Sequence, residues 1–325
     1  MSMARCSPGM GSSLINAPAH WTRAHGLGND YLVVEPIALP SGVRLIPQTA
    51  RLICDRHRGV GSDGILELLP PTGTPERFAL RIWNPDGGTA EKSGNGLRII
   101  AKYLREHGHT AADSFTIVTL GGDAAIALDL DPQTGRVASI TVDMGVPEFD
   151  PRTQITVAGD ELAVTILSVD NPHCVTIVPD IDAVDLERLG PLIERHPAFP
   201  NRTNVQFVTP VGPDRVRAIV WERGAGVTLA SGSSASAVAA ACHRQGLVGN
   251  AVTVAMPGGD LHVRIGDNGQ LSLAGPAEEI CQGTFSADLL AHLRALSAEG
   301  DNSSGGHSSP DEREPSQATL SSRLS

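Results

Sequence analysis

The chain has 325 residues, of which 41% are hydrophobic and only 3% aromatic, and its formal net charge at pH 7 is −11. This length and hydrophobic content are enough for one large domain or two of ordinary size, each with an aliphatic core. The acidic balance argues against nucleic-acid binding, which requires a basic surface, and no apolar run is long enough to span a membrane.

The first 20 residues contain one arginine and no continuous apolar segment, so we expect a flexible extension rather than a secretory signal. The five cysteines are scattered without a Cys-x-x-Cys pair; they are Cys6, Cys54, Cys174, Cys242 and Cys281. This spacing is typical of reduced thiols in a cytoplasmic protein, and it indicates neither a disulfide framework nor a metal site.

Short runs of alternating or β-branched apolar residues, separated by Gly, Pro, Asn and Asp, predict strands along most of the chain. In chain order these are 30–36, 64–69, 78–84, 114–120, 123–130, 136–144, 163–169, 174–178, 204–210, 215–222, 251–258 and 261–265. Helical periodicity predicts helices at 49–57, 96–108, 185–196, 234–246 and 286–299. Because strands outnumber helices and do not alternate with them, the predicted fold class is α+β. From residue 297 to 325 the chain is rich in Ser, Gly, Asp, Glu and Pro, which predicts a disordered tail.

An internal repeat divides the chain into two similar halves. In each half a helix ends in Arg-His or a similar pair and is followed by two strands, the second of which ends in Trp and a polar residue. Ten residues after each of these tryptophans, Trp83 and Trp221, stand Ser93 and Ser231, each followed by Gly and an apolar helical run. Two like halves predict a pseudo-twofold molecule with a ligand cleft between them.

The two Ser-Gly corners allow two interpretations. A serine before a helix is ordinarily an N-cap that accepts a hydrogen bond from a backbone N–H. Two helix N-termini that face one cleft could instead hold a carboxylate, and Gly94, Gly96 and Gly232 would allow its close approach. The duplication, with a polar residue at the same offset upstream in both halves, favours the ligand site.

Three further stretches carry candidate polar residues, each with an ordinary structural alternative. "HGLGND" places Asn29 in a glycine-bracketed turn, where it could donate to a ligand or simply form the turn. "DNPHCV" places Asn171 and His173 between strands, which alone is a weak signal. "ERGAG" places Glu222 beside Arg223, which is either a surface ion pair or a means of binding a carboxylate.

Taken together, seven stretches in order resemble the diaminopimelate epimerase family. They are "HGLGNDYLVVE", "DRHRGVGSDGILEL", "RIWNPDGGTAEKSGNG", "SVDNPHCV", "FPNRTNVQFV", "VWERGAGVTLASGS" and "MPGGDLHVRI", and they run from about residue 22 to residue 285. The resemblance implies two pseudo-symmetric domains, each a curled, mostly antiparallel sheet around a central helix, with the active site in the cleft between them. It implies residues 21–140, completed by 276–296, for the first domain and residues 141–275 for the second.

The resemblance also implies an activity: cofactor-independent interconversion of LL- and meso-diaminopimelate, with no pyridoxal phosphate and no metal, in a cytoplasmic homodimer. One group removes the α-proton, and a second group on the opposite face returns a proton. Family members have a cysteine at each helix start, whereas this sequence has Ser93 and Ser231 there. Unperturbed cysteine titrates near pH 8.5, and a serine hydroxyl is a far weaker acid. Serine therefore keeps the position of the reacting group but does not readily supply the ionised form that acts as a base.

The remaining site residues are carried over by motif. Asn84, Asn171, Asn204, Glu222 and Arg223 are expected to bind the distal amino-acid end and the α-amino group of the substrate. Gly94, Asn95, Gly232 and Ser233 are expected to supply donors to carboxylate oxygens, with Asn29 nearby. His173 and Glu222 are expected to orient the amino group and tune the reacting pair.

Three explanations of the two serines remain open at this point. The protein could be a diaminopimelate epimerase whose serine is activated by His173 or Glu222. It could be a related isomerase of another substrate, or a binding-competent paralogue with impaired catalysis. An engineered Cys→Ser exchange is a further possibility. The match of the ligand-holding residues favours the first explanation.

Overall fold

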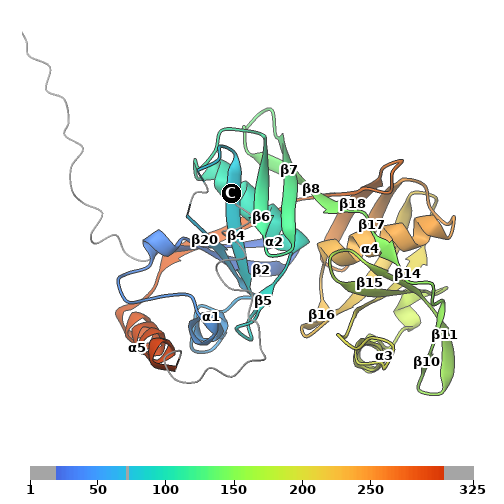
Figure 1. The fold of residues 1–325 in the computed structure, drawn as a ribbon. Coiled ribbons are helices and arrows are strands. Elements are labelled where there is room, and N and C mark those ends of the chain that lie inside the picture. The colour runs from blue at the N-terminus through green and yellow to red at the C-terminus, as the bar shows by residue number, and fades with distance from the viewer. Residues whose placement is uncertain (1–19, 71–72, 304–325) are drawn as a thin grey trace, which may run out of the picture.

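The computed structural model describes residues 20–70 and 73–303, which form an α+β fold with two lobes (Figure 1). The described helices are α1 (Pro47–Cys54), α2 (Gly94–Glu106), α3 (Leu186–Glu194), α4 (Gly232–Arg244) and α5 (Ala287–Ser303), with short 3-10 turns at Pro36–Ala38 and Ile181–Ala183. The predicted α+β class is therefore confirmed, and each of the five predicted helices has its counterpart.

The first lobe is a curled sheet in which antiparallel pairs are joined by two parallel contacts. Its strands are β1 (His20–Gly26), β2 (Asn29–Val34), β3 (Ile65–Leu68), β4 (Arg77–Trp83), β5 (Thr89–Ala90), β6 (Ser114–Thr119), β7 (Gly122–Leu130) and β8 (Val137–Gly145). β2 runs parallel to β3, and β4 runs parallel to β6, while β3–β4, β6–β7 and β7–β8 are antiparallel.

The second lobe repeats this pattern of pairing strand by strand. Its strands are β12 (Thr165–Ser168), β13 (Pro172–Ile177), β14 (Asn204–Pro210), β15 (Arg215–Glu222), β16 (Gly226–Thr228), β17 (Ala251–Met256), β18 (Gly259–Ile265) and β19 (Leu271–Gly275). β13 runs parallel to β14, and β15 runs parallel to β17, as β2–β3 and β4–β6 do in the first lobe. The strand pairings thus give the internal repeat of the sequence a structural counterpart.

The two lobes exchange their last strands. β8 pairs with β19 between the lobes, after which β9 (Glu148–Phe149) pairs with β12 of the second lobe. In the same way, the chain leaves β19 and forms β20 (Glu278–Thr284), which pairs with β1 of the first lobe. A separate hairpin of β10 (Gln154–Val157) and β11 (Asp160–Ala163) completes the described strands. The boundaries 21–140 and 141–275 themselves remain predictions.

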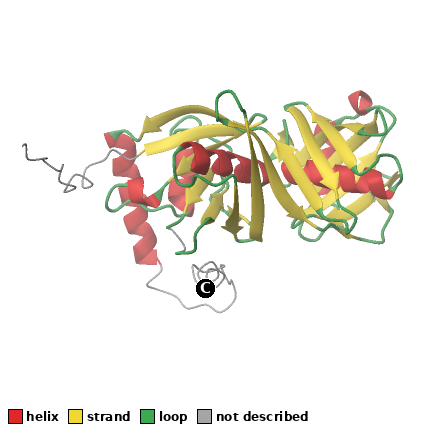
Figure 2. Ribbon diagram, turned by 90° about the horizontal axis from the view of Figure 1, so that it is seen from above, coloured by secondary structure: helices red, strands yellow, loops and turns green. Residues whose placement is uncertain are grey.

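A central helix lies among the strands of each lobe (Figure 2). The exposed surface of α2 is confined to its last turns, and residues 94–102 are all buried. In α4 every residue from Ser234 to Cys242 is buried, and most are alanine. A helix that is enclosed on all sides needs small apolar residues around its whole circumference, which is why this segment shows little amphipathic contrast.

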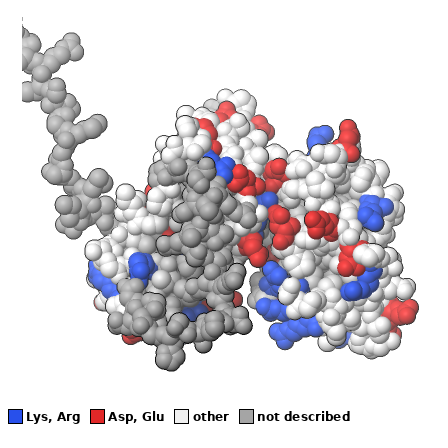
Figure 3. Space-filling model, in the orientation of Figure 1, with Lys and Arg blue, Asp and Glu red and all other residues white. Residues whose placement is uncertain are grey.

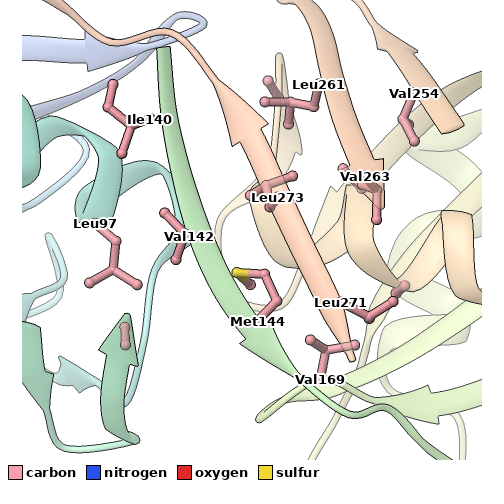
Figure 4. Close-up of a cluster of buried hydrophobic side chains, with 14 of the residues drawn as sticks. Leu97, Ile140, Val142, Met144, Val169, Val254, Leu261, Val263, Leu271 and Leu273 are labelled. Atoms are coloured by element: carbon pink, nitrogen blue, oxygen red, sulfur yellow. The ribbon is translucent and has the colours of Figure 1, made fainter. Parts of the chain in front are cut away.

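Aliphatic side chains also fill the junction between the lobes. Val142 and Met144 of β8 lie beside Leu271 and Leu273 of β19, and Leu97 of α2 lies close by (Figure 4). These side chains are at most 2% exposed, so the junction is part of the main core. The dry junction fixes the two lobes against each other along the β8–β19 pair.

Several elements escaped prediction. β1, β10, β11, β19, β20 and the strands of two or three residues were not expected, and β20 has no buried residue that would have marked it. The tail expected from residue 297 begins as helix, because α5 continues to Ser303 and Ser297 is buried, where its hydroxyl accepts a hydrogen bond from the Arg44 N–H at 3.1 Å. The expected N-terminal extension, apart from His20, and the rest of the tail lie outside the described residues.

Candidate active site

Both Ser-Gly corners are helix starts. Ser93 has extended backbone angles, and its Oγ accepts a hydrogen bond from the Gly96 N–H at 3.1 Å. Ser231 has nearly the same angles, and its Oγ accepts from the Ser234 N–H at 3.4 Å. The cap interpretation of both serines is therefore correct as far as it goes.

The two helix starts are in direct contact with each other. A Cβ atom added at Gly94 would lie 3.0 Å from the Cα of Gly232, and one added at Gly232 would lie 2.9 Å from the Cα of Gly94. Only glycine at both positions permits this approach. Two helix N-termini, each with unpaired N–H groups and partial positive charge, consequently meet at one place, which suits an anion.

Ser93 has a tyrosine as its neighbour. The Oη of Tyr31, on β2, lies 3.3 Å from the Oγ of Ser93. Burial raises the pKa of Tyr31 above its ordinary value, the contact with Ser93 opposes this increase, and the negative charge of Glu222 adds to it. The phenol is therefore protonated at neutral pH and can share its proton with Ser93.

Ser231 has a carboxyl group as its neighbour. Ser231 is only 4% exposed, and Glu222 stands at the end of β15. Burial raises the pKa of Glu222, an interaction with the Ser231 hydroxyl opposes this increase, and the negative charge of Asp63 adds to it. A carboxyl with a raised pKa is a stronger base than an ordinary one, so this side of the site is suited to accept a proton.

A chain of side-chain amides connects the lobes beneath the helix starts. Asn95 is 3% exposed, and its Nδ2 donates to the Oδ1 of Asn29 at 3.0 Å and to the carbonyl of Ala230 at 2.9 Å. Asn29 in turn donates to Asp63 at 3.0 Å. Because Ala230 directly precedes Ser231, this chain fixes the second helix start relative to the first.

His173 is the counterpart of Tyr31 in the second lobe. The residue that follows Tyr31 pairs with Ile65 of β3, and the residue that follows His173 pairs with Val205 of β14, which is the equivalent strand. His173 is fully buried, its Nε2 lies 2.7 Å from the Oδ1 of Asn171, and its Nδ1 accepts from Gln206 at 2.9 Å. Burial, together with the charge of Arg223, lowers the pKa of His173 to about 3, although the Gln206 hydrogen bond opposes this shift. His173 is thus neutral at physiological pH.

No hydrogen bond between His173 and either serine occurs in the part of the chain that the structure describes. The histidine reaches the second helix start only indirectly, because Gln206 also donates to the Oγ of Ser234 at 3.0 Å. The expectation that His173 activates a serine directly has no hydrogen bond to support it among the described residues, and Glu222 is the ionisable group whose pKa the Ser231 hydroxyl lowers.

Four of the predicted residues line two adjoining hollows. One has a volume of about 10 Å³ and is lined by Gly94, Ser233 and Asn171 among others. The second has a volume of about 350 Å³ and is lined by Asn171 and Arg223. Because Asn171 lines both, the larger hollow leads from solvent toward the helix starts.

The ion pair between Lys92 and Asp170 spans the two lobes beside these hollows, with 2.8 Å between Nζ and Oδ2. Lys92 directly precedes Ser93, and Asp170 directly precedes Asn171. Side chains of both charges line the boundary between the lobes on the face shown in Figure 3.

Asn204 and Asn84 lie at different places of the repeat: Asn204 begins β14, and Asn84 follows Trp83 of β4 as Glu222 follows Trp221 of β15. Asn204 is 5% exposed, donates to the carbonyl of Pro172 at 3.0 Å and accepts from the Arg223 N–H at 2.9 Å. Asn84 is half-buried, and its backbone closes the turn after β4 through Gly87 and Gly88. Asn204 therefore holds the loop that carries Arg223.

None of the cysteines in residues 20–70 and 73–303 stands at a helix start. Burial raises the pKa of Cys54 to about 11 and the pKa values of Cys174 and Cys242 to about 12. Over the same residues, no group of three or more His, Cys, Asp or Glu side chains could hold a metal ion, and no helix is long and apolar enough to cross a membrane.

Comparison with known proteins decides the family. The family model described as diaminopimelate epimerase matches residues 22–149 and 165–280. A diaminopimelate epimerase from Pelotomaculum thermopropionicum is 41% identical over 280 residues, which is 82% of this chain and 98% of that protein. Diaminopimelate epimerase 2 from Nostoc sp. is 42% identical, over 82% of this chain and 95% of that protein. The chain belongs to the diaminopimelate epimerase family.

Solved structures with little sequence identity share the fold. A hydroxyproline epimerase from Agrobacterium vitis has a TM-score of 0.64 at 16% identity, and the match covers 84% of this chain and 92% of that one. A predicted epimerase from Pseudomonas aeruginosa has a TM-score of 0.60 at 17% identity and covers 82% and 99%. A methylitaconate-delta-isomerase has a TM-score of 0.55 at 13% identity and covers 85% and 98%.

Tyr31 of this diaminopimelate epimerase family member was not predicted as a site residue. Its position at the third residue of β2 was visible as the counterpart of His173 in the repeat, but a tyrosine inside an apolar strand is typical of ordinary core packing. The contact with Ser93 depends on how far the helix start approaches the strand, which the sequence does not specify.

Proposed function

We propose that this protein interconverts LL- and meso-diaminopimelate by proton transfer at the α-carbon, without a cofactor. The observation that carries the proposal is the contact between Gly94 and Gly232, which brings one Ser-capped helix start from each lobe to the same place in a member of this family. Inversion requires one proton-transfer group on each face of a carbon, and two facing lobes supply such a pair.

The helix starts have a second task in this proposal. Removal of the α-proton leaves negative charge that spreads onto the neighbouring carboxylate. The N–H groups of Gly94 and Asn95 and those of Gly232 and Ser233 are the donors that would receive this charge. Donors that are already oriented in a site shielded from water stabilise such charge more than solvent does.

Serine must work with a stronger acid–base group, because its own alkoxide is too rare at neutral pH. On the side of the second lobe, Glu222 can accept the Ser231 proton while Ser231 accepts the α-proton, so that the net transfer is from carbon to Glu222. On the side of the first lobe, Ser93 can give its proton to the carbanion and recover one from Tyr31. In the opposite direction of the reaction each group reverses its role, and exchange with water restores the starting state.

The substrate has a second amino-acid end, for which we propose the larger hollow. Arg223 lines it and can bind a carboxylate through two N–H groups, with Asn171 between the hollow and the helix starts. Asn84 and Asn204 shape the neighbouring loops. We also propose that the protein is a cytoplasmic homodimer, as the family resemblance implies, which sedimentation of the purified protein would test.

Deuterium exchange tests the proposed reaction directly. Purified protein is incubated with LL-diaminopimelate in deuterated water, and loss of the α-hydrogen signal and appearance of the meso isomer are followed. The proposal predicts both, at a rate that depends on protein concentration. Binding without exchange would support a paralogue with impaired catalysis. The absence of both binding and exchange would overturn the proposed activity.

A pair of restored cysteines tests the role of the serines. Ser93→Cys with Ser231→Cys should increase the exchange rate, because a thiol near a helix start ionises far more readily than a hydroxyl. The matched control is Ser139→Cys, a half-buried position on β8 away from the helix starts. A restored pair that binds substrate but remains as slow as the parent protein would show that the serines do not limit the rate.

A further inference from the structure

Arg98 is a fully buried cation of α2, and no acidic side chain within residues 20–70 and 73–303 pairs with it. Its side chain is 0% exposed, and its three hydrogen bonds go to uncharged acceptors. Nη1 donates to the carbonyl of Gly94 at 3.2 Å, Nη2 to the Oδ1 of Asn95 at 2.8 Å, and Nε to the carbonyl of Pro276 at 3.1 Å. Burial lowers the pKa of Arg98 to about 10, so the guanidinium is still charged at neutral pH.

The guanidinium lies between the two helix starts. A Cβ atom added at Gly232, the first residue of α4, would lie 3.3 Å from Nη1 of Arg98. A Cβ added at Gly26 would lie 2.9 Å from Nη2, and one added at Gly275 would lie 3.3 Å from Nε. Three glycines, at the ends of β1 and β19 and at the start of α4, therefore leave the space that this cation fills.

The repeat has only one such cation. Arg98 stands five residues after Ser93, and the residue five positions after Ser231 is Ser236. The Oγ of Ser236 donates to the carbonyl of Gly232 at 3.0 Å, just as Nη1 of Arg98 donates to the carbonyl of Gly94. A second arginine at this position would compete for the space between the helices, so one guanidinium lies against both starts.

An unpaired buried charge is costly, and the cost falls when an anion binds nearby. We propose that Arg98 is a positioning residue whose single buried charge increases the affinity of both helix starts for anions: the carboxylate of the substrate and the negative charge that grows on it. This inference rests on the proposed function for the identity of the anion. The charge and its placement do not depend on that function.

Introduced thiols provide a test that needs neither substrate nor turnover. Ser93→Cys and Ser231→Cys are prepared singly, and the pKa of each new thiol is measured from the pH dependence of its alkylation, followed by peptide mass spectrometry. Each is then combined with Arg98→Met, Arg98→Gln or Arg98→Lys. The matched control is Arg105→Met, which removes from the same helix a half-buried cation that pairs with Asp113.

Loss of the charge should raise the thiol pKa at both positions by about one unit in Arg98→Met and Arg98→Gln, since a nearby opposite charge shifts a pKa by about 1–3 units. Arg98→Lys should keep most of the depression, and Arg105→Met should change neither thiol. The other ionisable groups near the thiols, namely Tyr31, Asp63 and Glu222, are the same in every variant and cancel in the comparison.

Equal pKa values with and without the Arg98 charge would overturn the proposal, as would a shift at only one of the two positions. A shift that Arg98→Lys shares in full would assign the effect to the hydrogen bonds rather than to the charge, which also overturns it. If Arg98→Met does not fold, Arg98→Gln decides, because it keeps a donor for Gly94. Failure of the epimerase reaction leaves this result unaffected, so the two proposals fail separately.

Discussion

His173 should make the stability of this protein fall as the pH drops below 6.5, and His173→Gln should remove that dependence. Its pKa is about 3 in the folded protein and about 6.5 in an unfolded chain. Above pH 6.5 the histidine is neutral in both states. Between the two pKa values, protons bind to the unfolded state first, so stability is lost as the pH falls.

The size of this effect follows from the two pKa values. Between pH 8 and pH 5, protonation of the unfolded chain lowers the free energy of unfolding by about 2 kcal/mol. Urea denaturation at both pH values measures it: the wild-type protein should lose about 2 kcal/mol more than His173→Gln. His262→Gln removes an exposed histidine from β18 and serves as the control.

Equal pH dependence in the wild-type and His173→Gln proteins would refute the assignment of a buried, neutral His173. The same assignment excludes a catalytic ionisation of this histidine above pH 5. The pH profile of α-hydrogen exchange should therefore keep its limbs in His173→Gln, even if the rate falls through loss of the contacts to Asn171 and Gln206. A limb near pH 6.5 that disappears in the variant would contradict this reasoning.

Three other changes probe the helix starts and the cleft. Gly232→Ala places a methyl group 2.7 Å from a leucine of β19 and should cost about 1–3 kcal/mol in urea denaturation, whereas Gly212→Ala, with no atom nearer than 3.6 Å, should change stability little. Glu222→Gln should slow α-hydrogen exchange by about 10²- to 10⁴-fold by NMR, and an unchanged rate would remove Glu222 from the role of base. Lys92→Met removes an ion pair of about 1 kcal/mol between the lobes, so substrate should dissociate about fivefold faster in stopped-flow measurements; an unchanged rate would mean that the pair does not hold the cleft.

The sequence predicted the helices and most of the longer strands because their apolar periodicity follows directly from what they bury. It also predicted the two helix starts, since Ser-Gly before an apolar run has a local physical cause. β20 could not be predicted, because its residues are mostly exposed and its pairing with β1 lies more than 250 residues away in the chain. Long-range pairing of this kind leaves no local pattern.

The tyrosine beside Ser93 was equally beyond prediction, whereas Glu222 was one of the two groups expected to activate a serine. Tyr31 and Ser93 are 62 residues apart, and their contact depends on the packing of α2 inside its sheet. The role of His173 stays a prediction: its residue type suggested proton transfer, whereas burial keeps its imidazole neutral at physiological pH. Residue type alone does not reveal burial, and burial decides which of these groups can exchange protons.

The exchange of strands between the lobes has a consequence for the folding of the protein during its synthesis on the ribosome. The first sheet is complete only when β20 (278–284) has been synthesised and has paired with β1 (20–26). The second lobe, in contrast, has received β9 by the time its own first strand is synthesised. The half that is made first is therefore the half that is finished last, and the nascent N-terminal lobe keeps an open strand edge until almost the whole chain has emerged.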